Sequence, residues 1–241
     1  MNDLRHIGKE QALFIAHKLR DELIFNMAKL EGNSLTFAET QTVIQGISVA
    51  GRPINDLNQV INIRDGWDEL INQIKTGTFK VDKENFVLMN KIVAKLENPS
   101  VGDFRTKPVL ITGTEYMPPM DMLLSTLFRE MLEDFEATSN FQSNHKLNFE
   151  STFNLFLDTA RNQYFEDGNK RTGQLMMNGV LILSGYAPFT ISPSRDTEFR
   201  QNLLDFYESG NKNEMIDFIY SSINSPRYLV MQQELEDDLE R

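Results

Sequence analysis

A short run in the second half of the chain combines side chains that bind phosphate and divalent cations. Asp167 is a hard oxygen ligand of the kind that Mg²⁺ prefers, and Lys170 and Arg171 add two positive charges close behind it. Gly168 can adopt backbone angles that its neighbours would find costly, so the Asp-Gly-Asn triplet predicts a tight turn. Asn169 is a neutral hydrogen-bond donor that suits a phosphate oxygen. The run therefore predicts a phosphate site.

Two helices are expected to position this turn. Apolar residues recur at intervals of three or four before it, which predicts an amphipathic helix over residues 148–165. From Leu175 to Leu183 the chain is apolar nearly all round, which predicts a helix buried inside the domain. The first amide groups of such a helix lack intrahelical partners and lie at the positive end of its dipole, so they attract an anion. Taken alone, the triplet is more typical of a plain helix cap followed by solvated cations.

The longer string from Phe165 to Gly173 resembles the signature of the Fic family, including its Doc branch. That signature reads His-x-Phe-x-(Asp/Glu)-Gly-Asn-(Gly/Lys)-Arg. The resemblance implies a mainly α-helical Fic (Fido) fold, with ATP as substrate and Mg²⁺ held by Asp167. It further implies a nucleotide- and phosphate-binding turn made by Gly168, Asn169, Lys170, Arg171 and Thr172. The positions implied to be catalytic are Gln163, Asn169 and Arg171.

Two positions depart from the family pattern. Gln163 stands where the family has its catalytic His, and Gln174 stands where many members have a second Arg. In the family, the His takes the proton from a Ser, Thr or Tyr hydroxyl of a target protein while that oxygen attacks the α-phosphate of ATP. A carboxamide cannot accept that proton, so a factor of about 10²–10⁴ in rate should be missing. Nucleotide binding should suffer less, although one bidentate phosphate contact is lost.

Other groups leave the chemistry open. The chain has three histidines, and none lies in the motif; His145 is interpreted as a solvated loop residue. Lys170 is the residue found in the Doc branch, which leaves open a reversed nucleotide pose that transfers the γ-phosphate. A substitute base, or a target activated in another way, is a further alternative.

The segment from Gly102 to Ile111, followed by Met117-Pro118-Pro119, resembles the flap of the family. That flap is a short β-hairpin that holds the target peptide as an added strand. Pro108 indicates an edge position, because proline cannot donate to a sheet. The target-binding residues implied by the resemblance are Arg105, Thr106, Val109, Leu110 and Ile111.

A segment near the N-terminus is similar to the start of Fic proteins that carry an inhibitory helix. Their motif, (Ser/Thr)-x-x-x-Glu-(Gly/Asn), presents its Glu to the second Arg. Glu31 matches the end of this motif, but Met27 occupies the Ser/Thr position and the Arg partner is Gln174. Glu31 is thus a possible inhibitory residue that could meet Lys170 or Arg171. The favoured interpretation is a surface carboxylate near a helix end.

The rest of the chain is predicted to be nearly all helix, in one compact unit. Further helices are expected at residues 9–30, 36–47, 53–74, 83–96, 118 or 119 to 135, 198–208 and 213–222. The expected organisation is an N-terminal helical region (1–97), a Fic core (98–226) and an acidic C-terminal tail (227–241).

Composition narrows the class of protein. The 241 residues are 40% hydrophobic and 24% charged, which is ordinary for a globular protein. A net charge of −11 makes nucleic acid a poor partner. The chain has no Cys, no signal-peptide pattern and no membrane-length apolar run, so we expect a cytoplasmic protein without disulfides that does not bind membranes.

Three functions are compatible with these residues. The first is a nucleotidyltransferase that transfers AMP from ATP to a hydroxyl of an unknown protein docked on the flap. The second is a catalytically impaired Fic pseudoenzyme that acts by binding a nucleotide or a protein. The third is a helical protein without nucleotide function, which the complete anion turn argues against. The sequence does not predict the target, the transferred group or the oligomeric state.

Overall fold

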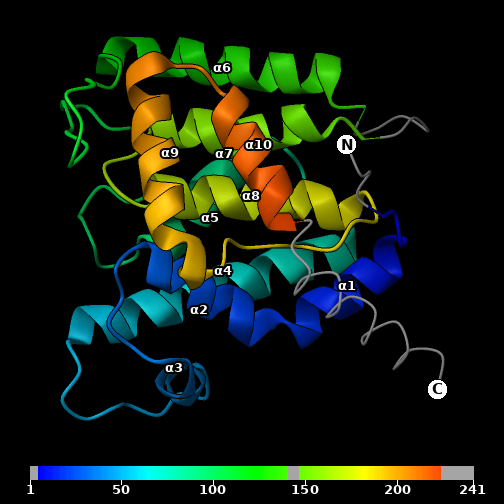
Figure 1. Ribbon diagram of the computed structural model, residues 1–241, viewed down its shortest axis with the longest axis vertical. Coiled ribbons are helices and arrows are strands. Elements are labelled where there is room, and N and C mark those ends of the chain that lie inside the picture. Colours follow the sequence, from blue (N-terminus) through cyan, green and yellow to red (C-terminus); the bar gives the residue numbers. More distant parts are fainter. Residues whose placement is uncertain (1–4, 141–146, 224–241) are drawn as a thin grey trace.

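The computed structural model describes residues 5–140 and 147–223, so His145 and the predicted acidic tail lie outside the described residues. Within these ranges the chain is helical and contains no strand (Figure 1), which confirms the mainly α prediction. The helices are α1 (Lys9–Lys18), α2 (Arg20–Leu30), α3 (Phe37–Ile44), α4 (Ile54–Thr76), α5 (Lys83–Val93), α6 (Asp121–Thr138), α7 (Phe149–Asn162), α8 (Asn169–Leu183), α9 (Asp196–Ser209) and α10 (Asn213–Ile223), with a 3₁₀ turn, η1 (Pro193–Arg195).

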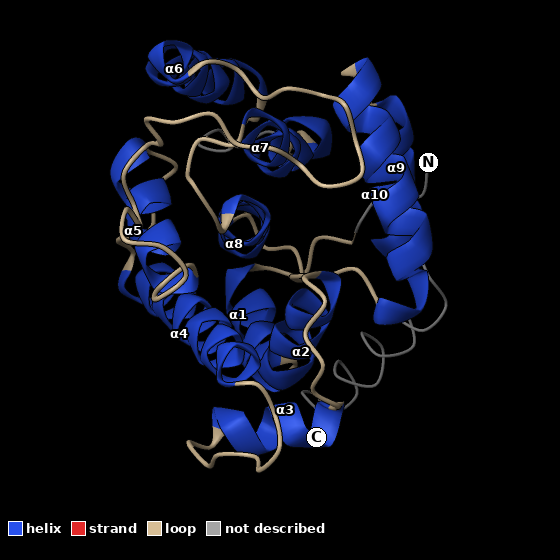
Figure 2. Cartoon of the chain, turned by 90° about the vertical axis from the view of Figure 1, so that its left-hand side faces the viewer, coloured by secondary structure: helices blue, strands red, loops and turns tan. Residues whose placement is uncertain are grey.

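Helix α8 runs through the middle of the molecule, as its apolar composition predicts. Figure 2 shows it almost end-on, with α7, α5, α4 and α1 around it. Every residue of α8 from Arg171 to Ile182 is buried. At Gly173 the backbone of α7 comes so close that an added Cβ would lie 3.0 Å from the Cα of Phe156. The start of α8 is therefore held firmly against its neighbour.

The helix expected over residues 9–30 is divided in two. Leu19, with φ −91° and ψ 0°, separates α1 from α2. Helix α1 packs on α8 and α4, whereas α2 packs mainly on α4 and also contacts α3. Both halves contact α4, and the break lets α1 also pack on α8 and α2 on α3, which the single apolar stripe in the sequence does not reveal. The other predicted helices are confirmed, with ends within three residues of those expected.

The segment expected to form a β-hairpin, residues 102–119, forms no strand. A turn is present at Thr112–Gly113, but the two arms do not pair. The hydroxyl of Thr114 and the N–H of Glu115 both donate to the carboxylate of Glu208 on α9, with the second bond at 2.8 Å. Prolines at 108, 118 and 119 remove further donors. The hairpin part of the prediction is wrong because these groups bond outside the segment.

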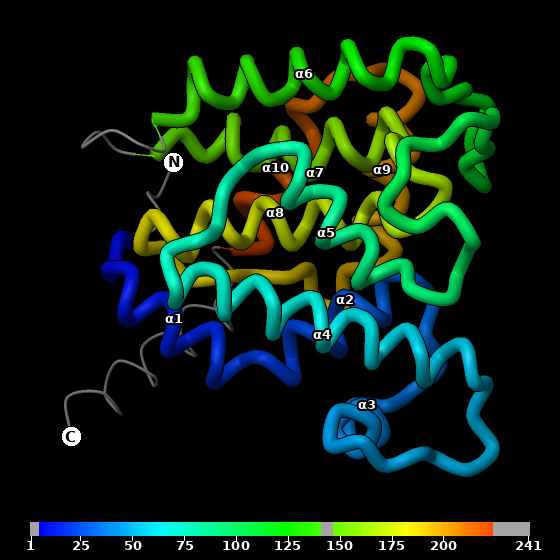
Figure 3. The backbone as a smooth tube through the Cα atoms, turned by 180° about the vertical axis from the view of Figure 1, so that it is seen from behind, coloured from blue at the N-terminus to red at the C-terminus, as the bar shows by residue number. Residues whose placement is uncertain are grey.

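One hydrophobic core joins the N-terminal helices to the rest. It includes Trp67 on α4 and Phe199 on α9, which are 0% and 1% exposed. Helix α3 lies at the edge of the molecule (Figure 3) and contacts α2 and α4. Among the described residues, none of the helices combines the length and hydrophobicity that a membrane crossing requires.

Candidate phosphate site

The turn between α7 and α8 begins at Gln163, whose backbone is left-handed with φ 49°. Its side-chain amide is engaged at both ends. Nε2 donates to the carbonyl oxygen of Ala160 at 2.6 Å, and Oε1 accepts from Nδ2 of Asn169 at 2.9 Å. Gln163 thus ends α7 and supports the turn, and its amide holds no group that could accept a proton at neutral pH.

Asn169, the first residue of α8, closes the turn from inside. Its Oδ1 accepts from the backbone N–H of Phe165 at 3.0 Å, and its Nδ2 donates to the carbonyl oxygen of Phe165 at 2.8 Å as well as to Gln163. The residue is 3% exposed. Both amide N–H groups of Asn169 are therefore used within the turn.

The turn rests on α5 through a buried asparagine, Asn90. Its Nδ2 donates to the carbonyl oxygen of Asp167 at 2.8 Å and to Oγ1 of Thr172 at 3.3 Å, and its Oδ1 accepts from the N–H of Gly102 at 2.9 Å. Gly168 has φ 75°, and an added Cβ would lie 2.9 Å from the Cβ of Ala94. The predicted left-handed turn is confirmed. The hydroxyl of Thr172, which is fully buried, faces Asn90.

Sequence reasoning missed Asn90, although a signal was available. Asn90 continues the buried stripe formed by Phe86, Met89 and Val93 on α5, where an amide needs buried partners.

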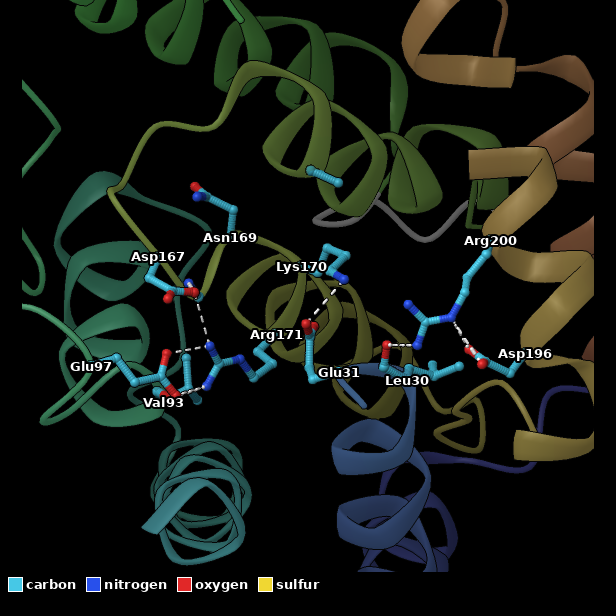
Figure 4. Close-up of polar contacts among 12 residues, drawn as sticks. Leu30, Glu31, Val93, Glu97, Asp167, Asn169, Lys170, Arg171, Asp196 and Arg200 are labelled. Carbon is cyan, nitrogen blue, oxygen red and sulfur yellow. Dashed lines mark hydrogen bonds and ion pairs between the residues drawn. The ribbon is translucent and has the colours of Figure 1, made fainter. Parts of the chain in front are cut away.

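Arg171 is 3% exposed and is surrounded by acceptors (Figure 4). Its Nη1 donates to the carbonyl oxygen of Val93 at 2.7 Å and to Oε1 of Glu97 at 2.5 Å. Its Nη2 donates to Oε2 of Glu97 at 2.5 Å and to Oδ1 of Asp167 at 3.1 Å. Burial lowers the pKa of Arg171, but the bonds and charges of the carboxylates outweigh burial and raise it above its ordinary value. Nothing in the sequence around Glu97 indicates this contact, which spans 74 positions.

Lys170 is paired with Glu31, whose carboxylate lies 3.0 Å from its Nζ. The side chain of Glu31 is only 15% exposed, so the favoured interpretation of a surface carboxylate is wrong, and the alternative of a contact with Lys170 is the observed one. Burial raises the pKa of Glu31, but the charges of Lys170, Arg171 and Arg200 outweigh it and hold the pKa below its ordinary value. Glu31 is therefore charged at neutral pH.

The loop that follows Glu31 is clamped to α4, which fixes its carboxylate. Asn33 is 5% exposed, and its Nδ2 donates to the carbonyl oxygen of Asp56 and to Oε1 of Gln59, both at 2.9 Å. From the other side, Nη2 of Arg200 donates to the carbonyl oxygen of Leu30 at 2.9 Å (Figure 4). Glu31 is thus held in place by α4 and α9.

A polar cavity of about 400 Å³ opens beside Arg171 and Asp167. Its wall includes Glu31, Glu97 and a row of amides on α4, formed by Asn55, Asn58, Gln59 and Asn62. This volume is within the range of small-molecule sites. Gln174 lies elsewhere: it lines a small cavity with Phe189 and Thr190, and its Nε2 has no partner in the described structure. Gln174 therefore adds no cation or donor to the phosphate turn.

Asp167 is the carboxylate best placed for a metal ion. Its side chain is 54% exposed; Oδ1 accepts from Gly168 and Arg171, and Oδ2 takes no part in those bonds. In the described ranges no cluster of three or more His, Cys, Asp or Glu residues could hold a metal by itself. Mg²⁺ commonly binds through one or two carboxylates together with substrate phosphates, and Asp167 fits that donor set.

Arg105 fastens the expected flap to the end of α7. It is 2% exposed, and its guanidinium donates to the carbonyl oxygens of Gln163 at 2.6 Å, Lys107 at 3.0 Å and Pro119 at 2.5 Å. Burial lowers its pKa. Of the other expected target-binding residues, Thr106 and Leu110 are exposed, whereas Val109 and Ile111 are half-buried.

Comparison with known proteins shows which family the region around the turn resembles. Residues 80–181 match the model of the Fic/DOC family. "Protein adenylyltransferase Fic" of Drosophila willistoni is 25% identical over 198 residues, covering 81% of this chain and 38% of the relative. The protein of the same name from Culex quinquefasciatus is 24% identical over 213 residues, covering 87% of this chain and 39% of the relative. The chain thus spans about two fifths of the length of these relatives.

Solved structures share the fold. A Fic domain containing signaling protein from Bacteroides thetaiotaomicron superimposes with a TM-score of 0.76 at 17% identity, covering 98% of this chain and 94% of that chain. Fic-1 from C. elegans gives a TM-score of 0.75 at 16% identity, covering 96% and 73%.

Proposed function

Because residues 80–181 are a Fic/DOC family domain, we propose that the chain binds a Mg²⁺-nucleotide at the turn before α8 but is impaired in transferring AMP to protein hydroxyls. The observation that carries this proposal is the state of Gln163. Its amide bonds to Ala160 and Asn169, and it offers no proton acceptor where the reaction needs one. The protein therefore acts mainly by binding.

The start of α8 supplies the binding half of this function. The helix has free amide groups and a positive dipole end there, next to Lys170 and Arg171. Asp167 would hold Mg²⁺ against the phosphates, and that ion would supply neutralisation of their negative charge. The cavity beside Arg171 leaves room for a ligand at this turn.

Glu31 supports an inhibited resting state. Its carboxylate lies 3.0 Å from Nζ of Lys170 and forms an ion pair with it. A phosphate has to displace Glu31 before it can bind Lys170. The position of Glu31 at the end of α2 agrees with the resemblance to Fic proteins that carry an N-terminal inhibitory helix. We therefore expect nucleotide affinity to rise when Glu31 loses its charge.

A second candidate is an active protein adenylyltransferase that uses another base. The names of the relatives support it, and so does the exposed, unpaired segment around Thr106 and Leu110, which could receive a target peptide as the resemblance implies.

Labelled ATP distinguishes the two candidates. The natural protein, Gln163→His and Asn169→Ala are incubated with Mg²⁺, cell lysate and ATP labelled at the α- or γ-phosphate, and affinity is measured by calorimetry. Each is also made in a Glu31→Gln background, so that the internal carboxylate does not mask binding. We expect the natural protein and Gln163→His to bind ATP alike, with transfer about 10²–10⁴-fold faster for Gln163→His.

Other results have equally clear meanings. Efficient transfer by the natural protein that disappears in Asn169→Ala would establish the second candidate. Transfer of the γ-label alone would indicate the reversed nucleotide pose. Absence of ATP binding at millimolar concentration, with Glu31→Gln included, would exclude both nucleotide functions.

A further inference from the structure

Arg171 has no hydrogen-bond donor left for a ligand. Each Nη carries two N–H groups. Those of Nη1 go to Val93 and Glu97, and those of Nη2 go to Glu97 and Asp167. The remaining donor, Nε, is buried without a partner and cannot be reached from solvent. A phosphate can thus bind Arg171 only if one of these acceptors leaves.

We propose that Glu97 is a second internal anion of this site, which must release Arg171 before a nucleotide phosphate can bind it. This inference rests on the proposed nucleotide binding. Glu97 is the acceptor to leave because it takes two of the four bonds, whereas Val93 contributes a backbone carbonyl of α5 and Asp167 belongs to the turn itself. The two cations of the turn are then held by carboxylates from different places: Lys170 by Glu31 and Arg171 by Glu97.

The segment that carries Glu97 is built so that it can move. Helix α5 ends at Val93, and Glu97 follows on an exposed turn. Leu96 has φ 68°, a conformation that side chains other than glycine rarely adopt, and it is 75% exposed. Apolar packing of Leu96 therefore contributes little to the position of this turn. The bonds between Glu97 and Arg171 join the end of this turn to the phosphate site, and the bond from Asn62 to the carbonyl oxygen of Lys95 holds its middle on α4.

A cavity beside Glu97 can receive its carboxylate after release from Arg171. Glu97 lines the cavity of about 400 Å³, together with the amides of Gln59 and Asn62. Nδ2 of Asn62 already bonds the carbonyl oxygen of Lys95 in the same turn. Burial raises the pKa of Glu97, even though the bonds and charge of Arg171 act in the opposite direction. A shift of the carboxylate into the cavity exchanges one set of polar partners for another.

The test is removal of the charge of Glu97 without changing its shape. We compare ATP with Mg²⁺ and inorganic tripolyphosphate as calorimetric probes of the natural protein, Glu97→Gln and Glu84→Gln. Glu84 is the matched control, because it is exposed at the other end of α5. Glu97→Gln should bind both probes roughly tenfold more tightly or better, the factor expected for a charge-assisted hydrogen bond to phosphate. Glu84→Gln should stay within about twofold, as a distant surface charge does.

A double-mutant cycle shows whether the effect passes through Arg171. In an Arg171→Gln background, Glu97→Gln should no longer increase affinity, because the occupied cation is gone. Glu97→Asp keeps the charge and shortens the side chain, so it should give a smaller gain; it also serves as the second variant if Glu97→Gln unfolds. Circular dichroism verifies folding of each variant.

A measurement without nucleotide tests whether Glu97 restrains the guanidinium of Arg171. Nitrogen-15 NMR of the Arg171 guanidinium should show hindered rotation in the natural protein and faster rotation in Glu97→Gln, but no change in Glu84→Gln. If Glu97→Gln binds ATP no more tightly than the natural protein, the proposed competition between Glu97 and phosphate for Arg171 is overturned, but nucleotide binding is not. Failure of every variant to bind either probe, in a Glu31→Gln background as well, would overturn the proposed nucleotide binding too.

Discussion

At Gly168 both the backbone conformation and the packing against α5 exclude a Cβ atom. Its φ is 75°, and an added Cβ would meet Ala94 at 2.9 Å and Asn90 at 3.0 Å. Gly51 has nearly the same φ, 77°, but an added Cβ there would have no neighbour within 4 Å. Gly51→Ala should therefore destabilise the protein by about 1 kcal/mol through the left-handed backbone alone. Gly168→Ala should destabilise it by about 2–4 kcal/mol, because overpacking is added.

Urea unfolding of the two variants measures this difference. Equal losses of unfolding free energy would mean that the turn can move away from α5, and that Asn90 does not hold it. Glycine at 168 would then serve only the backbone angle.

Residue types in the motif could be predicted from the sequence, but their partners could not. Gly168 had to be left-handed, and it is. Glu97 and Asn90 lie more than 70 positions from the motif residues that they bind, and no local pattern connects them. The contact of Glu31 with Lys170 could not be favoured for the same reason: it depends on where the end of α2 lies relative to the start of α8.

At the scale of a single element, α3 begins with a reciprocal capping box. The side chain of Glu39 accepts from the N–H of Thr36 at 2.8 Å, and Thr36 accepts from the N–H of Glu39 at 3.3 Å. Arg52 adds two bonds to the same carboxylate, at 2.9 and 2.8 Å. The bond from Thr36, followed by that from Arg52, lowers the pKa of Glu39 from 4.5 to about 2.

This lowered pKa predicts how the stability contribution of Glu39 changes with pH. Because the folded state holds the charged form, the contribution is complete above the ordinary pKa of 4.5 and is lost as pH falls through about 2. The natural protein should exceed Glu39→Gln in unfolding free energy by the same amount from neutral pH down to about pH 5, and by less at each lower pH. Glu133→Gln, which removes an exposed carboxylate paired with Arg129, is the control. A difference that grows as pH falls would contradict the assignment.

Apolar spacing predicted the positions of the helices that bury a single face along their whole length. The spacing failed at Leu19, where α1 turns toward α8 and α2 toward α3. The hairpin implied by the resemblance failed at residues 102–119, where Glu208 of α9 accepts the bonds of Thr114 and Glu115 and Arg105 binds the carbonyl oxygen of Pro119. Both departures depend on tertiary contacts, which periodicity within one segment does not contain.

At the scale of the whole molecule, the shared core predicts that both halves unfold together. Trp67 is the single tryptophan, lies on α4 and is 0% exposed, so its fluorescence reports on the N-terminal helices. Phe199 lies on α9, 1% exposed, and stacks on Phe156 with ring centroids 6.4 Å apart. A cavity made at Phe199 should therefore lower the unfolding midpoint reported by Trp67 fluorescence, although the two residues lie in different halves of the chain.

Phe199→Leu tests this coupling. It should lower the unfolding free energy by about 1–3 kcal/mol, less than the about 3–5 kcal/mol typical of Phe→Ala in a core. The urea midpoints from Trp67 fluorescence and from far-ultraviolet circular dichroism should fall together, because one cooperative transition moves all probes equally. If the fluorescence midpoint stayed at its natural value while the circular dichroism midpoint fell, the N-terminal helices would be a separate unit. Glu31 could then leave Lys170 by local separation of α2, whereas in a single cooperative unit its release requires a ligand that competes for the cation.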